Sequence, residues 1–192
     1  GPPDMGGTVA AWIAASRAVA RARAAETGAR PGARPAEEGF ALAFELAAET
    51  LRRGSHGALI GDLLPYHGAA AQRYGLDLVM SAGGPRIAGG GTGPRSAFLT
   101  AFSYSEEMGR LLTEAIGGWR AAGGTVFTAF VDVAPPSPSG RWGALRHLQD
   151  DSPRWQALMR ANATPPRWHD PRLPGTFLHE APRRTGAGGA RP

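Results

Sequence analysis

Asp132 is the side chain of this sequence that we expect to carry acid–base chemistry. It comes late in the apolar segment 125–133, TVFTAFVDV, and a carboxylate there can act as an acid, a base or a sugar ligand. Its alternative role is to hydrogen-bond the backbone of the loop that follows. The rings of Tyr104, Trp142 and Trp155 could stack on the apolar faces of sugars, although packing in a core is the more common role for each.

The sequence carries no pattern that predicts a metal ion or another cofactor. Cysteine is absent, and neither His67 nor His147 has a partner at the spacing of metal ligands. All 21 basic residues are arginine, so no lysine is available for a Schiff base or a phosphate-binding P-loop. The glycine-rich segment 83–93 leaves two alternatives open: a flexible loop, or a phosphate site to which Arg86 or Arg95 adds positive charge.

Length and composition predict one folded domain followed by a loose tail. The chain has 192 residues, of which 42% are hydrophobic, and this is enough to build a core. We expect the domain to span residues 1–162, and residues 163–192, which are rich in proline, glycine and arginine, to be disordered. The net charge of +5 lies largely in that tail without clustering, so we expect no specific nucleic-acid partner. No run of 18 apolar residues occurs, and we therefore expect no membrane span.

The elements that would position these side chains are predicted from hydrophobic periodicity. Helices are expected over residues 8–26, 36–53, 59–74 and 105–122, with one or two helical turns over 96–102. In the third helix, Pro65 and Gly68 predict a kink or a split. Ser105 is expected to cap the fourth helix. The short apolar segments 76–80 and 125–133 are predicted to be buried strands.

The order strand, helix, strand over residues 76–133 predicts a βαβ unit. Its two strands should run parallel, with residues 105–122 packed across them in a right-handed crossover. Two parallel strands cannot cover both of their faces, and we find no convincing further strand in residues 1–75 or 134–192. Because the chain also starts at Gly1 rather than methionine, we expect it to be one part of a larger α/β fold. The remainder of that fold, or another chain, would be its partner.

Several motifs occur in an order that resembles one protein family. In chain order they are LPYH at 64–67, YSEEMG at 104–109, GWRAAGG at 118–124, FVDV at 130–133 and WGALRH at 142–147. This order resembles the C-terminal part of a bacterial family of glycoside-hydrolase-like (β/α) barrel proteins, over roughly residues 8–160. The resemblance implies an α/β fold, a partial (β/α)8 (TIM) barrel made of C-terminal β/α units with a helix-rich N-terminal half. It also implies a carbohydrate partner and a secreted protein.

One departure from the pattern of that family bears on activity. Its members usually have Tyr-Glu-Gly-Gly-Thr-His after the strand at 76–80, whereas this sequence has SAGGPR at 81–86. A glutamate at the carboxyl end of a barrel strand supplies one of the two carboxylates that a glycosidase needs, and Ala82 cannot do so. The resemblance therefore implies a catalytically impaired relative of a glycoside hydrolase, with Asp132 as the remaining catalytic candidate. The residues expected to contact the sugar are Ser81, Arg86, Tyr104, Trp142 and His147.

Two functions of other classes remain open beside this one. The first is a non-enzymatic interaction module, in which exposed sheet edges pair with another chain. The second is a phosphate-ligand-binding barrel that uses the glycine-rich loop 83–93. Whether the chain is an enzyme is also left open by the sequence, and an active form would be a glycoside hydrolase.

Overall fold

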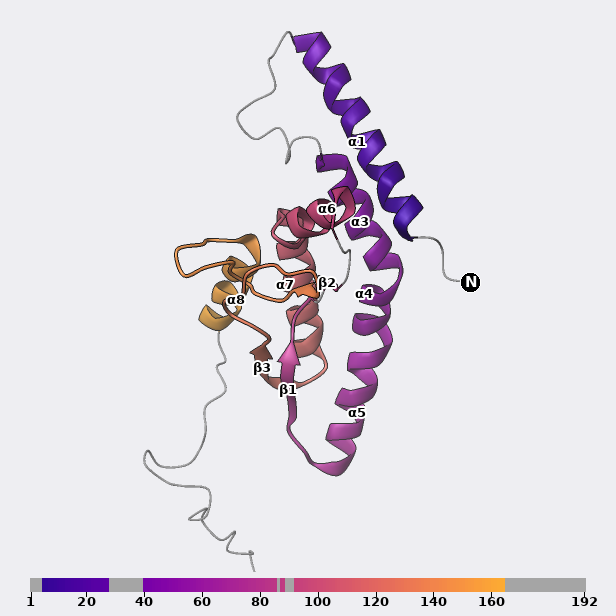
Figure 1. Ribbon diagram of the computed structural model, residues 1–192. Helices are drawn as coiled ribbons and strands as arrows, with labels where there is room; N and C mark the ends of the chain where they lie inside the picture. The colour runs from indigo at the N-terminus through magenta and orange to yellow at the C-terminus, as the bar shows by residue number, and fades with distance from the viewer. Residues whose placement is uncertain (1–4, 28–39, 86, 89–91, 165–192) are drawn as a thin grey trace, which may run out of the picture.

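The structure is dominated by helices. A computed structural model describes residues 5–27, 40–85, 87–88 and 92–164, and 64% of the described chain is helical (Figure 1). The helices are α1 (Met5–Thr27), α3 (Ala41–Arg53), α4 (Ser55–Ala58), the π-helical turn η1 (Leu59–Leu63), α5 (Leu64–Tyr74), α6 (Pro94–Ser103), α7 (Glu106–Ala121) and α8 (Pro153–Ala163). The expected tail, 163–192, lies outside the described residues from position 165 onward.

Four short strands form two separate sheets in the described part of the chain. They are β1 (Leu78–Gly83), β2 (Ile87–Ala88), β3 (Gly124–Ala129) and β4 (Gly140–Arg141). β1 and β3 pair in parallel, with Met80 opposite Phe127, and β2 and β4 pair antiparallel. On α7, Trp119 packs edge-to-face against Phe127 of β3, with ring centroids 6.4 Å apart. The prediction of two parallel strands with α7 packed across them is therefore confirmed.

The expected partial (β/α)8 barrel is wrong. A barrel requires a long row of parallel strands, whereas the described residues contain one parallel pair and one antiparallel pair. The main core also lies between helices and not between a sheet and the helices that cover it. The βαβ pattern is a local signal, and it does not determine how many further strands join a sheet. The fold is a helix-rich mixture of helices with two small sheets.

The main core lies where α1, α3, α6 and α7 meet. Neighbouring phenylalanine rings at its centre have centroids 5.5–6.0 Å apart. Each such ring removes about 150–250 Å² from water, so this cluster dominates the hydrophobic stabilisation of the helices. The four rings belong to Phe40, Phe44, Phe98 and Phe102, and α1 adds Val9 and Ile13.

Helix α7 begins as the sequence predicts. The Oγ of Ser105 accepts a hydrogen bond from the backbone N of Met108 at 3.3 Å. Glu106 and Glu107 lie in the first turn, where the helix dipole favours negative charge. The buried side of the helix carries Met108, Leu111, Leu112, Ile116 and Trp119. Because α3, η1, α6, α8 and β3 all contact α7, it is the helix on which the described elements assemble.

The segment expected as the third helix, 59–74, consists of the π-helical turn η1 followed by α5, which runs through Pro65 and Gly68, so the helix is not split at these residues. α4, η1 and α5 follow one another without a gap and form one helical run (Figure 1). Pro65 lies in the first turn of α5, where proline is tolerated best. Gly75 ends the run with a φ of 62°, a left-handed conformation that glycine adopts without strain. π-helical turns are uncommon and occur frequently at functional sites.

Two features of the structure were not predicted from the sequence. Helix α8 begins after Ser152, whose Oγ accepts a hydrogen bond from the backbone N of Trp155 at 3.1 Å. The sequence does contain a typical start for this helix, since Ser152 is a capping residue and Pro153 follows it in the first turn. The β2–β4 pair has two residues in each strand, which is too short to produce a hydrophobic alternation. The strand expected over 125–133 also ends earlier, at Ala129.

Candidate functional site

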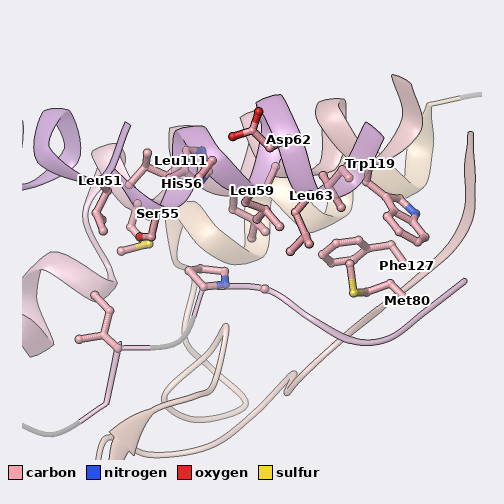
Figure 2. Close-up of a pocket in the computed structure, with 18 of the residues that line it drawn as sticks. Leu51, Ser55, His56, Leu59, Asp62, Leu63, Met80, Leu111, Trp119 and Phe127 are labelled. Carbon is pink, nitrogen blue, oxygen red and sulfur yellow. The ribbon is translucent and has the colours of Figure 1, made fainter. Parts of the chain in front are cut away.

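An apolar groove of 970 Å³ separates β1 from the helical run of α4 and η1 (Figure 2). Leu59 and Leu63 project from η1 toward β1, which contributes Met80. Trp119 of α7 and Phe127 of β3 lie at one end. Binding sites in proteins commonly have volumes of about 300–1,000 Å³ and a mostly apolar lining. The groove therefore has the size and the surface of a binding site.

The order of residues along the chain explains why both walls of the groove are apolar. Leu59 and Leu63 are four positions apart, so they lie on one face of the helical run. Met80 and Phe127 are register partners in parallel strands and therefore point to the same face of the sheet. Gly118 lets η1 approach α7, since a Cβ at this position would lie 3.0 Å from Cγ2 of Ile60.

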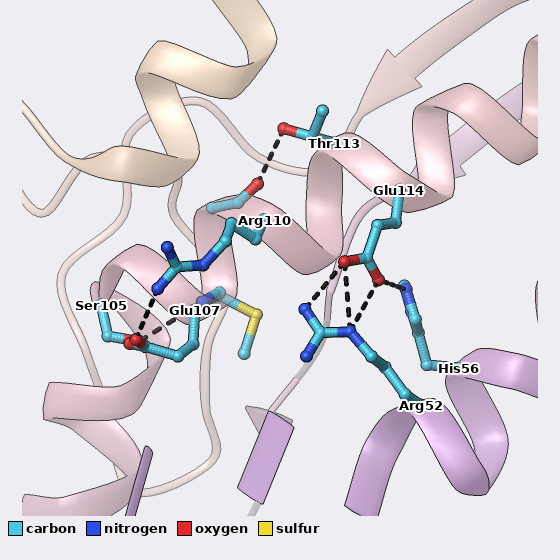
Figure 3. A network of polar contacts seen from close by, with 9 residues as sticks. Arg52, His56, Ser105, Glu107, Arg110, Thr113 and Glu114 are labelled. Atoms are coloured by element: carbon cyan, nitrogen blue, oxygen red, sulfur yellow. Dashed lines mark hydrogen bonds and ion pairs between the residues drawn. The ribbon is translucent and has the colours of Figure 1, made fainter. Parts of the chain in front are cut away.

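A charged network joins the helical wall of the groove to α7. Glu114 on α7 accepts hydrogen bonds from Nε and Nη2 of Arg52 at 2.8–3.1 Å (Figure 3). The Nε2 of His56, a residue that lines the groove, lies 3.3 Å from the same carboxylate. The hydrogen bonds from Arg52 hold the pKa of Glu114 below its ordinary value. These contacts tie α3 and α4 to α7 and so keep the wall in place.

Among the described residues, the face of the β1–β3 pair that points away from α7 exposes apolar side chains. Side chains alternate along a strand, so Val79 and its register partner Val126 point away from Met80 and Phe127. Val79 is 56% exposed, and Phe130, just beyond β3, is 54% exposed. Parallel strands are normally covered on both faces. Apolar side chains that no described residue covers on this face indicate an interaction surface.

The residues predicted to bind a sugar lie in and beyond the two parallel strands. Ser81 is exposed within β1, and Asp132 is exposed beyond the end of β3. His147 is exposed on the segment between β4 and α8. Arg86, also predicted to contact the sugar, lies outside the described residues, and so does part of the loop 83–93. Ser81, Asp132 and His147 do not line the groove.

Asp132 and Trp142 are brought close together by the backbone. The chain turns back after β3, so that Asp132 O accepts a hydrogen bond from Leu145 N at 2.8 Å. One residue earlier, Val131 N donates to Trp142 O at 3.4 Å. The indole of Trp142 is half-buried and packs edge-to-face on Phe130, with centroids 5.7 Å apart. Trp142 therefore has a packing role in the fold, whereas the side chain of Asp132 is open to solvent.

Tyr104 is held by two arginines at the junction of α6 and α7. The guanidinium carbons of Arg146 and Arg154 lie 4.8 and 5.8 Å from the centroid of its ring. Burial raises the pKa of the Tyr104 hydroxyl above its ordinary value. The structure thus gives Tyr104 packing partners, which is the alternative role that the sequence left open for it.

The carboxylate of Asp150 fixes the segment between β4 and α8. It accepts hydrogen bonds from the backbone N and the Nε of Arg146 at 2.8 and 2.7 Å, and from Nη2 at 2.7 Å. The side chain of Asp150 is only 5% exposed, and these bonds hold its pKa well below the ordinary value of 3.8. A carboxyl whose pKa is lowered by folding stabilises the protein above its unfolded-state pKa, and this contribution is lost as the pH falls through the folded-state value.

Replacing Asp150 with asparagine is expected to lower the free energy of unfolding by about 1.5–3 kcal/mol at neutral pH, because charged hydrogen bonds are lost. The difference from the wild-type chain should shrink as the pH falls below about 4, where the wild-type carboxyl is protonated on unfolding. Urea unfolding at several pH values measures both effects. Asp151→Asn is the matched control, since Asp151 is exposed and accepts a single bond from Gln156. Equal losses in both variants would contradict the prediction.

The described residues show neither a metal site nor a membrane span. No group of three histidine, aspartate or glutamate side chains among them is arranged to hold a metal ion. None of the helices in these ranges is long and apolar enough to cross a bilayer.

The groove is the part of the site that sequence reasoning missed. Leu59, Leu63 and Trp119 follow helical spacing, which predicts buried core positions as readily as a groove. The π-helical turn η1, which carries Leu59 and Leu63, has no distinct signal in the sequence. The exposure of Leu63, 49%, depends on which elements do not pack on it, and no local pattern encodes that.

Comparison with known proteins does not place the chain in a family. No protein-family model, curated protein or solved structure matches it. The resemblance to glycoside-hydrolase-like proteins therefore stays a prediction from the motifs. The function must be inferred from the geometry of the groove and the open strand pair.

Proposed function

We propose that this chain is a non-enzymatic interaction module whose parallel strand pair is extended by a strand from another chain. The observation that carries the proposal is that β1 and β3 form a sheet of only two strands within the described residues. Each of these strands has one edge that no other described strand covers. The backbone N–H and C=O groups of such an edge are a template for strand pairing.

Two physical arguments support a partner strand. A sheet of two strands is marginal in water, and parallel sheets are usually larger and covered on both faces. The uncovered face also exposes the apolar side chains of Val79 and Phe130. Pairing with a further strand satisfies the backbone groups of the edge, and the side chains of that strand enlarge the apolar surface that a partner can bury.

Binding of a synthetic peptide with the sequence of residues 125–133, TVFTAFVDV, tests the proposal. This sequence contains most of β3 and already pairs in parallel with β1 within the fold. Saturable binding that slows amide hydrogen exchange in β1 or β3 is the expected result. A peptide with Thr128→Pro is the control, because proline removes a donor and does not fit a strand interior. If the TVFTAFVDV peptide protects neither strand, the proposal is wrong.

Sugar binding is a second candidate, supported by the placement of Asp132. This carboxylate is exposed beside the segment that carries Trp142, as a sugar ligand next to an aromatic ring would be. Titration with a panel of oligosaccharides should then show an affinity that drops about tenfold in Asp132→Ala and in Trp142→Ala. Asp77→Ala is the matched control, since Asp77 is exposed but precedes β1 at the opposite end of the strands. Unchanged binding in both test variants would argue against this site.

A further inference from the structure

We infer that a small monovalent anion, of the size of chloride, binds at the junction of α6, α7 and α8, where it accepts hydrogen bonds from Tyr104 and Arg154. The hydroxyl oxygen of Tyr104 and the Nε of Arg154 are buried, and neither has a hydrogen-bond partner among the described residues. Both groups can donate, and buried donors in proteins are rarely left unpaired. Tyr104 and Arg154 belong neither to the lining of the groove nor to β1 or β3, so the inference is independent of the proposed function.

The charge of Arg154 explains why the occupant is an anion and not a water molecule. Arg154 is only 3% exposed, and in the described part of the chain no carboxylate pairs with its guanidinium. Its Nη1 and Nη2 donate to the backbone oxygens of Arg141, Trp142 and Pro85, which are neutral and leave the charge uncompensated. Water would accept from the two free donors but would not neutralise this charge. Buried charges in proteins are usually paired, so an anion fits the position better than water.

The side chains around Tyr104 make this position electropositive. The guanidinium carbons of Arg146 and Arg154 lie 4.8 and 5.8 Å from the centroid of its ring. Burial raises the pKa of the Tyr104 hydroxyl, whereas the charges of Arg154, Arg146 and Arg141 act in the opposite direction. The pKa stays above its ordinary value, so the hydroxyl is protonated at neutral pH and can donate. Of the described carboxylates, that of Asp150 also acts on this hydroxyl, but hydrogen bonds hold it on Arg146.

The number of free donors limits the size of the anion. Two donors suffice for a monatomic ion, whereas sulfate or phosphate has several oxygens that would each need a partner once water is excluded. The site also lies close to the surface, since Tyr104 is half-buried and the exposed side chain of Arg146 lies over its ring. An ion can therefore enter from solvent when this arginine side chain moves. Bound there, the ion would join the start of α8, through Arg154, to the junction of α6 and α7, through Tyr104.

The experiment follows the Nε–H signal of Arg154 by NMR in the full chain while sodium chloride replaces sodium gluconate at constant ionic strength. Gluconate is too large for the site, and the constant ionic strength keeps general screening unchanged. We expect a saturable shift of this signal and a midpoint of thermal unfolding about 3 °C higher in about 0.1 M chloride. Tyr104→Phe removes the hydroxyl donor and should weaken chloride binding about tenfold. Tyr66→Phe is the matched control, since Tyr66 is 70% exposed and its substitution should leave both effects unchanged.

The measurements separate the anion from water and this site from any other. If the Arg154 signal and the unfolding midpoint are the same in chloride and in gluconate, no anion binds and the inference is overturned. A chloride effect of equal size in Tyr104→Phe would place the ion elsewhere and also overturn it. If Tyr104→Phe does not fold, as judged by circular dichroism, the titration of the wild-type chain decides. A saturable shift of the Arg154 signal then supports the site, and a shift confined to other arginines overturns it.

Discussion

Replacing Arg154 with methionine is expected to lower the free energy of unfolding by about 2–4 kcal/mol. Arg154 is only 3% exposed and donates hydrogen bonds at 3.0–3.3 Å to the backbone oxygens of Arg141, Trp142 and Pro85. It thereby joins the start of α8 to the segment after β4 and to the exit of β1. Methionine retains much of the apolar stem but donates no hydrogen bond, so these oxygens lose the bonds from Arg154, and the Trp142 oxygen keeps the one from Val131 N.

The direction of this effect results from two opposing contributions. Burial lowers the pKa of Arg154, which shows that removing the guanidinium from water opposes folding. Removing a buried charge can for this reason be neutral or stabilising when the remaining groups are apolar. Here the remaining groups are carbonyl oxygens, and leaving buried polar groups unpaired costs more than the desolvation that is avoided.

Urea unfolding of Arg154→Met at neutral pH measures the loss. Arg110→Met is the matched control, because Arg110 is 62% exposed and pairs only with Glu107 one helical turn away. Such surface pairs contribute less than about 1 kcal/mol. A loss in Arg154→Met no larger than in Arg110→Met would mean that the three carbonyl bonds do not hold these segments together.

The same substitution, glycine to alanine, is expected to have opposite effects at two positions of α7. At Gly109 a Cβ would lie 2.8 Å from Cβ of Pro153 and 2.9 Å from its carbonyl oxygen. Because Pro153 begins α8, the clash would push the two helices apart, and we expect a loss of about 1–3 kcal/mol. At Gly117 a Cβ would meet nothing within 4 Å. Alanine there should stabilise the protein by about 0.5–1 kcal/mol, because alanine favours the helix.

Thermal or urea unfolding of the two variants measures this difference in sign. Both positions lie in one helix, so their helix propensities are comparable and the packing of α8 separates them. Combining the two substitutions should give the sum of the single effects, since the sites are two turns apart and share no contact partner. A stabilising effect of Gly109→Ala would show that α8 does not pack on α7 as closely as the structure has it.

Local sequence patterns predicted the individual elements well where near neighbours determine them. The cap of α7 at Ser105 is confirmed, whereas α5 continues through Pro65 and Gly68, where a kink or split was predicted. The parallel pairing of β1 with β3 is also confirmed, since a strand, a helix and a strand of these lengths have few ways to pack. Helix α8 was not predicted, although Ser152 followed by Pro153 is a typical helix start.

The prediction of a partial barrel was wrong for a different reason. A βαβ unit occurs in many folds, and the motifs that resemble a barrel family lie in its loops and helices. Nothing in residues 1–75 predicts a strand, and the structure fills the described part of that range with helices, which form an aromatic core together with Phe98 of α6. The number of strands in a sheet depends on what lies beside them in space.

Part of the candidate site could be predicted from the sequence, and part of it could not. Asp132 and Trp142 could be proposed from residue type alone, and the sugar function that they suggest stays a prediction. The groove could not be proposed from residue types. The exposure of Leu63 and the edge of β1 that no described strand covers both depend on how η1 lies relative to the strand. Likewise, no pattern within the chain indicates that Arg154 bonds the oxygen of Pro85, 69 residues away.

By itself, the sequence determined most of the helices, the Ser105 cap of α7 and the parallel pair, because hydrophobic periodicity and capping act between residues a few positions apart. Only the tertiary structure decided that β1 pairs with no described strand other than β3, and that an apolar groove lies between η1 and this strand pair. These properties arise from contacts between distant segments and from contacts that are missing. Local sequence patterns do not predict which contacts between distant segments are absent.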